Sequence, residues 1–393
     1  MNKFIPLCIP NFEGNEEKYV NEAVAQGWVS TGGAYITQLE EEMAKYLHVE
    51  KAVACQSGTA AIHLCLVQCG VGPEDGVIVP TLTFIAAVNP VKYQFAHPIF
   101  IDCDDSLCMD PKKLLAFCKE QCEFTDGKLF TKEGHHHIKA MVVVHVFGNM
   151  ADMEAIMDIA KTYNIRVIED ATEALGTSYT SGKYKGMYAG TIGDFGAYSY
   201  NGNKVITTGG GGLLVAKDTE EAKHLQYLST QAKDDHIFYI HHEVGYNYRM
   251  TNVQAALGVA QMEELEEFLS RKRKNYELYK KGFENAKNIS VMEFREGTNS
   301  NKWFYSLNID MDKLKINARE LVETLSEKGV GTRLIWGLIA EQKPYVKDLR
   351  TDLSTAKYYA ARILNIPSST GITEEEIDYV IKTVKEVVEE NSL

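Results

Sequence analysis

Three groups of residues in this chain have the types and positions that a catalytic site needs. Lys204 stands in the stretch SYNGNKVITTGGGG, where four glycines follow the lysine closely. Asp170 ends the apolar run IRVIED, which predicts a strand with a carboxylate at its carboxyl end. Residues 57–59, Ser-Gly-Thr, precede an apolar helical run and predict a helix N-terminus with free N–H groups. An amine, a carboxylate and an anion-binding helix end are therefore available to one site.

Each group also has an ordinary structural explanation. Ser57 is typical of a helix cap, Asp170 of a turn, and Lys204 of a solvated loop followed by a plain glycine turn. Together they match the needs of pyridoxal 5′-phosphate: a lysine that forms an imine with the aldehyde, an anchored phosphate, and a carboxylate that keeps the pyridine nitrogen protonated. The residues by themselves leave both interpretations open.

The elements around these residues indicate an α/β fold. Residues 51–216 alternate short apolar runs (VEKAVAC, GVIVP, HPIFIDC, IKAMVVVHV, IRVIED, GGLLVA) with helical patterns (AAIHLCLVQCG, TFIAAVNPVKY at residues 83–93, ADMEAIMDIAKTY). This alternation predicts a largely parallel sheet. Helical periodicity then continues for about thirty residues from Thr251 and predicts one long helix between two domains. We expect a large domain over residues 1–269 and a small α+β domain over residues 270–393.

Composition excludes several classes of function. The formal net charge of −13 argues against nucleic acid as a partner, so an anionic substrate needs local donors. No apolar stretch approaches the length of a membrane span, and the first residues lack the pattern of a secretory signal. Eight scattered cysteines fit reduced thiols. These features predict a cytoplasmic protein with no membrane partner.

Two further clusters are interpreted as structural. His135, His136 and His137 follow Cys118 and Cys122, but adjacent histidines on a strand cannot all face one ion, so no metal site is expected. The basic segment RKRKNYELYKK, residues 271–281, is helical and surrounded by acids, which favours a solvated helix face.

The order of the motifs resembles a known family. WVSTGGAYITQLEEEMAKYL, QSGTAAIHLCL, PTLTFIAAVNPV, VIEDATEALG, GDFGAYSYNGNK, TTGGGG and GYNYRMTNVQAALG follow one another as in the DegT/DnrJ/EryC1/StrS aminotransferases. The similarity runs nearly end to end. It implies the fold type I, aspartate aminotransferase-like architecture of pyridoxal phosphate enzymes, and transfer of an amino group to a nucleotide-linked sugar.

The resemblance also implies roles for individual residues. Lys204 matches the lysine that bonds to the cofactor aldehyde and later moves the proton. Asp170 matches the acid paired with the pyridinium nitrogen. Gly58, Thr59 and Ser199 match phosphate-binding positions.

Three other positions of the cofactor site follow from the same resemblance. Phe84 matches the aromatic residue that stacks on the cofactor ring. Asn247 matches a residue that reaches the phosphate from a neighbouring subunit, which implies a homodimer with a shared active site. Glu173 departs from the family pattern, where glutamine or histidine is more common. A carboxylate there would repel the cofactor phenolate unless it is protonated or turned aside, so its role stays open.

The expected substrates are L-glutamate and a 4-keto sugar nucleotide. Arg249 is a candidate for a carboxylate or diphosphate, and Trp336 for the wall of the substrate site; an ion pair and a core aromatic are the structural alternatives. The segments EDATEALG and STQAKDD resemble the bacillosamine and legionaminic acid branch, which aminates UDP-2-acetamido-2,6-dideoxy-4-keto-glucose. A GDP-linked, perosamine-type substrate is the alternative.

Two other functions are kept as competing hypotheses. A sugar 3-dehydratase shares this fold, but such relatives carry histidine where this chain has Lys204. A non-catalytic binding protein has no need to retain both Lys204 and Asp170.

Overall fold

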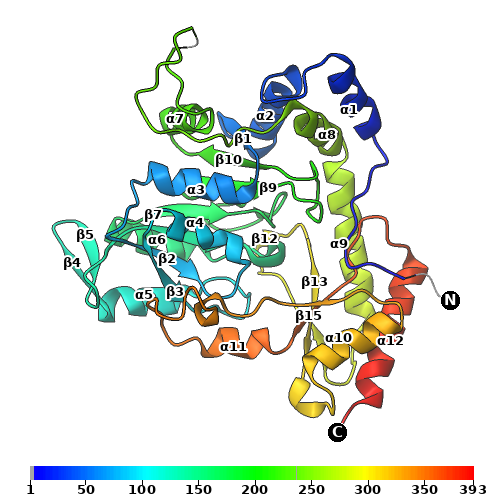
Figure 1. The fold of residues 1–393 in the computed structure, drawn as a ribbon. Coiled ribbons are helices and arrows are strands. Elements are labelled where there is room, and N and C mark those ends of the chain that lie inside the picture. The colour runs from blue at the N-terminus through cyan, green and yellow to red at the C-terminus, as the bar shows by residue number, and fades with distance from the viewer. Residues whose placement is uncertain (1–3, 236) are drawn as a thin grey trace.

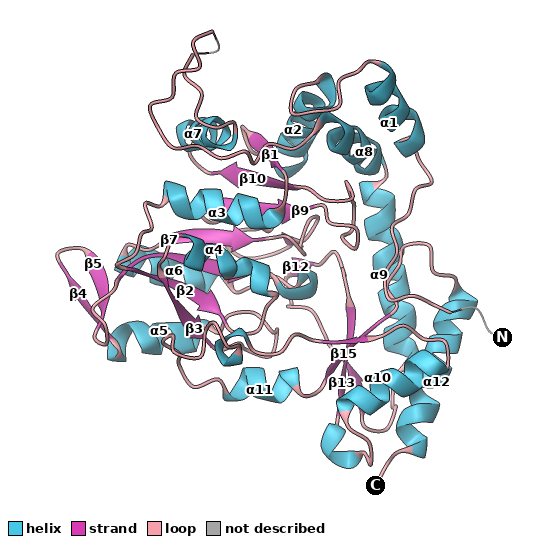
Figure 2. Ribbon diagram, viewed as in Figure 1, coloured by secondary structure: helices cyan, strands magenta, loops and turns pink. Residues whose placement is uncertain are grey.

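A mixed β-sheet forms the centre of the larger part of the molecule (Figures 1 and 2). The computed structural model describes residues 4–235 and 237–393. The strand order is β1 (Ala52–Cys55), β10 (Gly212–Ala216), β9 (Phe195–Ser199), β7 (Arg166–Asp170), β6 (His137–Val144), β2 (Asp75–Pro80) and β3 (His97–Ile101). β10 pairs antiparallel with both of its neighbours, and the pairs from β9 to β3 are parallel. The predicted largely parallel sheet is confirmed.

The helices around this sheet bury its strands. α3 (Gly58–Gln68) contacts β7, β9 and β10, and α6 (Met153–Tyr163) contacts β7. α2 (Ala34–Leu47) and α7 (Thr219–Ser229) contact β1, while α1 (Glu16–Ala25) packs on α8 (Asn252–Glu263). The strands read as unbroken apolar runs because they are buried on both faces, as parallel strands are.

Two predicted helices differ from the structure. The stretch 83–93 forms a single 3₁₀ turn (Ile85–Ala87) and the short α4 (Asn89–Tyr93), because Pro90, which has no N–H, occupies the first turn of α4. The long helix from Thr251 divides at Glu264 into α8 and α9 (Leu265–Gly282). α8 is held between α1 and α2, whereas α9 runs on to the second sheet, and periodicity cannot report that change of direction.

A second, antiparallel sheet follows α9 in the chain and lies beside the lower part of that helix (Figure 1). Its order is β11 (Ile289–Val291), β13 (Tyr305–Ile309), β15 (Ile363–Ile366) and β14 (Arg333–Leu334). α10 (Ala318–Glu327) and α12 (Glu374–Glu390) belong to the same region, and β12 (Thr298–Asn299) pairs with β8 (Ser178–Tyr179). α11 (Ser354–Ala360) instead packs on the larger part, where the N–H groups of Thr355 and Ala356 donate to Asp102. The N-terminal segment joins here, since Ile5 bridges Val330. A domain boundary at residues 269/270 stays a prediction.

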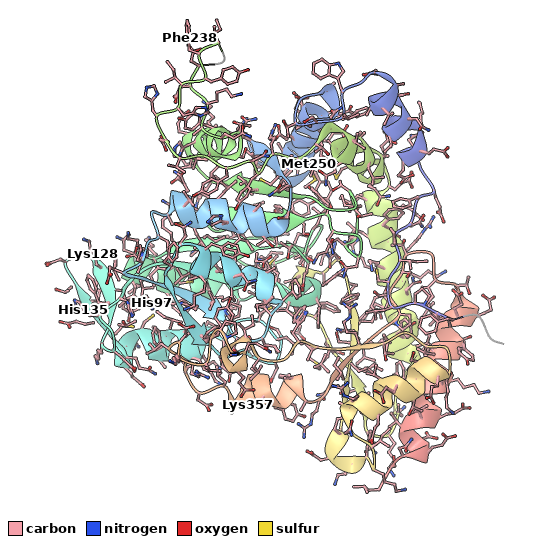
Figure 3. The ribbon with its side chains drawn as sticks, viewed as in Figure 1. His97, Lys128, His135, Phe238, Met250 and Lys357 are labelled. Carbon is pink, nitrogen blue, oxygen red and sulfur yellow. The ribbon has the colours of Figure 1, made fainter. Side chains whose placement is uncertain are left out.

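One hairpin was missed in the sequence. After α5 (Pro111–Glu120), β4 (Cys122–Thr125) pairs with β5 (Lys128–Thr131). The two turn residues, Asp126 and Gly127, both have positive φ, at 50° and 73°. Asp-Gly between two short strands is a strong hairpin signal, so the sequence contained the information. Figure 3 shows this hairpin, with Lys128 and His135, at the edge of the molecule.

The glycines after Lys204 allow a close approach of two backbones. A Cβ on Gly212 would lie 2.4 Å from the carbonyl carbon of Ser57 and 2.5 Å from the nitrogen of Gly58. β10 therefore passes against the start of α3 only because residue 212 has no side chain.

Among the residues that the structure describes, no helix combines the length and the apolar character that a membrane span requires.

We expect Gly212→Ala to destabilise the protein by about 1–3 kcal/mol, because the added methyl group overlaps backbone atoms that cannot move independently. Gly202→Ala is the matched control, since a Cβ there meets nothing within 4 Å. Urea unfolding of both variants measures the difference. Equal midpoints for the two variants and the unmodified protein would contradict the close approach.

Candidate active site

A pocket of about 400 Å³ opens at the carboxyl ends of β7 and β9, beside the start of α3 and the strand β14. This is the edge where open α/β sheets bind ligands. Most residues singled out in the sequence line it: Gly58, Thr59, Phe84, Asp170, Glu173, Ser199, Lys204 and Trp336. The structure thus brings together segments that are more than a hundred residues apart in the chain. The roles of these residues stay predictions.

Lys204 lies in a turn after β9, where its N–H donates to the carbonyl of Asn201 at 2.9 Å. Its side chain is only 13% exposed, and Nζ lies 3.9 Å from Oε1 of Glu173. Burial lowers the pKa of Lys204, while the carboxylates of Glu173 and Asp170 act in the opposite direction. A buried amine of lowered pKa is more often neutral, as a nucleophile or a proton acceptor must be.

Asp170 is the last residue of β7, and it pairs in register with Ala197 of β9, the strand that leads to Lys204. The carboxyl group is buried and accepts a hydrogen bond of 3.0 Å from the Thr172 N–H. Burial raises the pKa of Asp170, and the hydrogen bonds from Thr172 and the charge of Lys204 counteract that effect. A buried carboxylate needs a partner, and a protonated ring nitrogen in the pocket would be one.

The start of α3 provides the anion-binding corner. Ser57 caps the helix, since its Oγ accepts the Ala60 N–H at 3.1 Å. The N–H groups of the first helical turn, which begins at Gly58, have no acceptor inside the helix and carry the positive end of its dipole. A Cβ on Gly58 would lie only 3.1 Å from Cβ of Ser199, so the helix end and the end of β9 are in contact. A phosphate fits these donors.

Glu173 is a buried residue of the pocket lining, and its carboxyl group faces Nζ of Lys204. Its Oε2 accepts the N–H of Phe147 at 2.8 Å. Burial raises the pKa of Glu173 to about 7 despite the nearby charge of Lys204. Phe147 itself has φ of +55°, a strained conformation for a side chain of this size. Of the two alternatives for Glu173, a protonated carboxyl group or a side chain turned aside, the structure does not show the second.

Aromatic rings form the walls of the pocket. Phe84 is 54% exposed, and its ring centroid lies 6.4 Å from that of Trp336. Trp336 in turn lies 4.9 Å from Phe147. An exposed aromatic face over the pocket is available for stacking on a flat ring.

Trp303 was missed in the sequence analysis. Its ring centroid lies 4.1 Å below Nζ of Lys204, and its Nε1 donates to the carbonyl of Asn203 at 2.7 Å. It therefore holds both the lysine side chain and the residue before it. No motif marks Trp303, because its position depends on how the second sheet packs against the first. Arg333, in the stretch GTRLIWGL, also lines the pocket and was missed.

Two predicted site residues are not brought to the pocket within one chain. Asn247 is exposed and bridges Thr230. Arg249 forms a nearly buried bidentate ion pair with Glu40, with Nη2 2.9 Å from Oε2, and it also donates to the carbonyl of Ala54. For Arg249 the structure thus shows the ion pair that was the structural alternative. Ligand binding by either residue stays a prediction.

The histidine cluster lies apart from the pocket. His136 stacks on His97 with ring centroids 3.8 Å apart, and His137 lies 3.8 Å from Asp75. Within residues 4–235 and 237–393, no group of three or more His, Cys, Asp or Glu side chains is placed to hold a metal ion.

The pocket fits the cofactor that the sequence predicts. It supplies a buried amine, a buried carboxylate one strand away, an exposed aromatic face and a helix N-terminus, each on a different element. These groups correspond to the aldehyde, the ring nitrogen, the ring face and the phosphate of pyridoxal 5′-phosphate.

We expect Glu173→Gln to change how the stability of the cofactor-free protein depends on pH. Burial raises the pKa of Glu173 from 4.5 to about 7, so the folded chain binds this proton more tightly than the unfolded chain. Between these two values the unmodified protein should lose stability as pH rises, by up to about 3 kcal/mol, and the variant should not.

Urea unfolding at about pH 5 and about pH 7.5 measures this loss. Glu17→Gln, at an exposed position, is the control and should behave as the unmodified protein. If the Glu173→Gln protein lost as much stability between these pH values as the unmodified protein, Glu173 of the unmodified protein would ionise as it does in water.

Known proteins resemble this chain along its whole length. GDP-perosamine synthase of Escherichia coli O157:H7 is 35% identical over 384 residues, covering 98% of both chains. GDP-perosamine synthase of Caulobacter vibrioides is 34% identical over 386 residues, again covering 98% of both. The crystal structure of a DegT/DnrJ/EryC1/StrS aminotransferase from Brucella abortus superposes with a TM-score of 0.85 at 25% identity, covering 95% of both chains.

The family match agrees with the fold and with the pocket. Residues 10–385 match the DegT/DnrJ/EryC1/StrS aminotransferase family. This range contains all the pocket residues described above. The fold type I architecture expected from the sequence is confirmed, and pyridoxal phosphate is the cofactor. The chain therefore belongs to the DegT/DnrJ/EryC1/StrS family of sugar aminotransferases.

Proposed function

We propose that this protein transfers the amino group of L-glutamate to C4 of a nucleotide-linked 4-keto-6-deoxy sugar. One observation carries the proposal: Lys204, Asp170 and the N-terminus of α3 line a single pocket in a chain of the sugar aminotransferase family. The products would be 2-oxoglutarate and a 4-amino sugar nucleotide. Such sugars serve bacterial glycans, so a role in polysaccharide biosynthesis is part of the proposal.

Each half of the reaction moves one proton at a carbon atom. When bound, the cofactor supplies an aldehyde for the amine and a ring that accepts the electron pair of the broken C–H bond. Lys204, freed as an amine, would take the proton from the α-carbon of glutamate and pass it to the aldehyde carbon of the cofactor. In the second half it would take a proton back from that carbon and deliver it to C4 of the sugar. Its lowered pKa suits it to both tasks.

The other residues of the pocket would hold the cofactor and orient it. Asp170 would pair with the ring nitrogen, and Gly58, Thr59 and Ser199 would bind the phosphate. Phe84 would cover the ring face. Glu173, with its pKa raised to about 7, can stay protonated beside an oxygen anion, or ionise beside the charged lysine. The intact Lys204 also disfavours the 3-dehydratase and the non-catalytic hypotheses.

Two nucleotides are candidates for the carrier. Two relatives, at 35% and 34% identity, are named GDP-perosamine synthase, and these names support a GDP-linked sugar. The segments EDATEALG and STQAKDD instead support a UDP-linked N-acetylated sugar of the bacillosamine or legionaminic acid type. We propose the common chemistry, amination at C4, for either carrier.

Product analysis tests this proposal. We expect mass spectrometry to find a 4-amino sugar when the enzyme, glutamate and a panel of GDP- and UDP-linked 4-keto-6-deoxy sugars are combined. Lys204→Ala should lower turnover at least about 1,000-fold, because it removes both the nucleophile and the proton carrier. Lys112→Ala, at an exposed position on α5, is the control. Full turnover by Lys204→Ala, or a 3-deoxy product, would refute the proposal.

We also propose that the active site is shared in a homodimer. The loop between α7 and α8 extends away from the molecule, and Figure 3 shows Phe238 at its end. Apolar residues are exposed along this loop: Ile237 at 80%, Phe238 at 76% and Val244 at 85%. Such a cluster favours contact with another chain. Asn247 lies at the base of the same loop.

A dimer in solution is the expected result of light scattering on the purified protein. Asn247→Ala should weaken cofactor affinity about 10-fold, through loss of one hydrogen bond to a charged phosphate. Gln38→Ala, exposed on α2, is the control. A monomer that binds cofactor and turns over normally would contradict the shared site.

A further inference from the structure

Arg333 is a cation at the pocket that the chemistry described so far does not use. Among the residues that line the pocket, the basic side chains are Lys204 and Arg333. Lys204 is committed to the reacting atoms. Within the described part of the chain, the guanidinium of Arg333 has no hydrogen bond or ion pair to another residue. Its guanidinium is therefore free to bind a ligand.

The backbone holds Arg333 firmly. Arg333 begins β14 and pairs there with Asn365 of β15. Two residues further on, the N–H of Ile335 donates to the carbonyl of Ile363 at 3.0 Å. Asn365 also lines the pocket, and its Oδ1 accepts the hydroxyl of Ser306 at 2.6 Å. A residue on a paired strand is better positioned than one on a loop.

Arg333 lies at the solvent side of the pocket. Its residue is exposed, whereas the Lys204 side chain is 13% exposed and Asp170 is 3% exposed. The reacting carbon must come to the amine of Lys204 at the buried end. Arg333 therefore meets a part of the ligand that is distant from the reacting carbon.

The electrostatics of the pocket make such a cation necessary for an anionic substrate. The chain carries a formal net charge of −13, and both Asp170 and Glu173 lie in the pocket. The field of the whole molecule therefore opposes an anion. A guanidinium binds two oxygens of a phosphate group in a forked geometry and keeps its charge at any physiological pH.

We propose that Arg333 binds the diphosphate of the sugar nucleotide, which makes it a determinant of substrate specificity. This inference rests on the proposed function. In a sugar aminated at C4, the diphosphate is attached to C1, across the ring from the reacting carbon. The α-carboxylate of an amino acid, by contrast, is bonded to the reacting carbon itself. An exposed cation at the mouth of the pocket matches the first ligand and not the second.

The two half-reactions separate these ligands. We expect Arg333→Gln to lower kcat/KM for the sugar nucleotide about 10- to 100-fold, the range for loss of a charge-assisted contact. The rate at which glutamate changes the absorbance of the bound cofactor in a single turnover should not change. Arg333→Lys should recover only part of the loss, because an ammonium cannot form the fork. Arg319→Gln, exposed on α10, is the control.

Calorimetry with GDP and UDP gives a second measurement that needs no turnover. Arg333→Gln should lower the affinity of the enzyme for GDP or UDP, whichever the unmodified enzyme binds, by a similar factor. A loss in the glutamate half-reaction, alone or together with the other, would overturn the assignment, as would unchanged kinetics.

Failure of the proposed function can be told apart from failure of the inference on Arg333. If the unmodified enzyme aminates none of the sugar nucleotides, the proposed function fails, and the calorimetry alone decides on Arg333. Equal affinities of the unmodified and Arg333→Gln proteins for GDP and UDP, or no binding by either, then overturn the inference.

Discussion

The burial of one lysine amine in a pocket with two buried carboxyl groups is the constraint on which the site depends. Burial lowers the pKa of Lys204 and raises the pKa values of Asp170 and Glu173. The charge of Lys204 partly offsets the shift of each carboxyl group, and the two carboxylates partly offset that of Lys204, whereas the charge of Asp170 raises the pKa of Glu173 further. None of the three could be removed without leaving a buried charge less well compensated. The protein therefore holds three groups whose pKa values are all shifted by burial and by one another's charge, a pattern common at sites that transfer protons.

The scaffold sets these groups in place through strand order and close backbone packing. Asp170 ends β7 and the turn of Lys204 follows β9, the neighbouring parallel strand, so both side chains lie at one edge of the sheet. Gly212 lets β10 pass against the start of α3, which brings the helix N-terminus to the same edge. The site is thus a product of sheet topology, and not of any local motif.

The carbonyl of Asn203 joins three regions of the chain next to Lys204. It accepts a hydrogen bond from Nε1 of Trp303, at 2.7 Å, and one from Sγ of Cys8, at 3.5 Å. Lys272, buried on α9, donates to the carbonyl of Trp303 at 2.9 Å. The N-terminal segment, the loop before β13 and α9 therefore all support the turn that carries the lysine, so the second sheet is part of the active-site structure.

Sequence alone determined the chemical types of the site and most of the elements that carry them. Asp170 could be assigned to a strand end and residues 57–59 to a helix start, because hydrophobic periodicity and capping are local properties. The Asp126–Gly127 hairpin is equally local, since Asp-Gly between two short strands favours a tight turn. Tertiary structure decided the rest. It placed Arg249 on Glu40, Trp303 under Lys204 and Arg333 at the pocket mouth, and it divided the long helix at Glu264. Those outcomes depend on contacts between segments distant in the chain, and the spacing of residues along a sequence carries no record of such contacts.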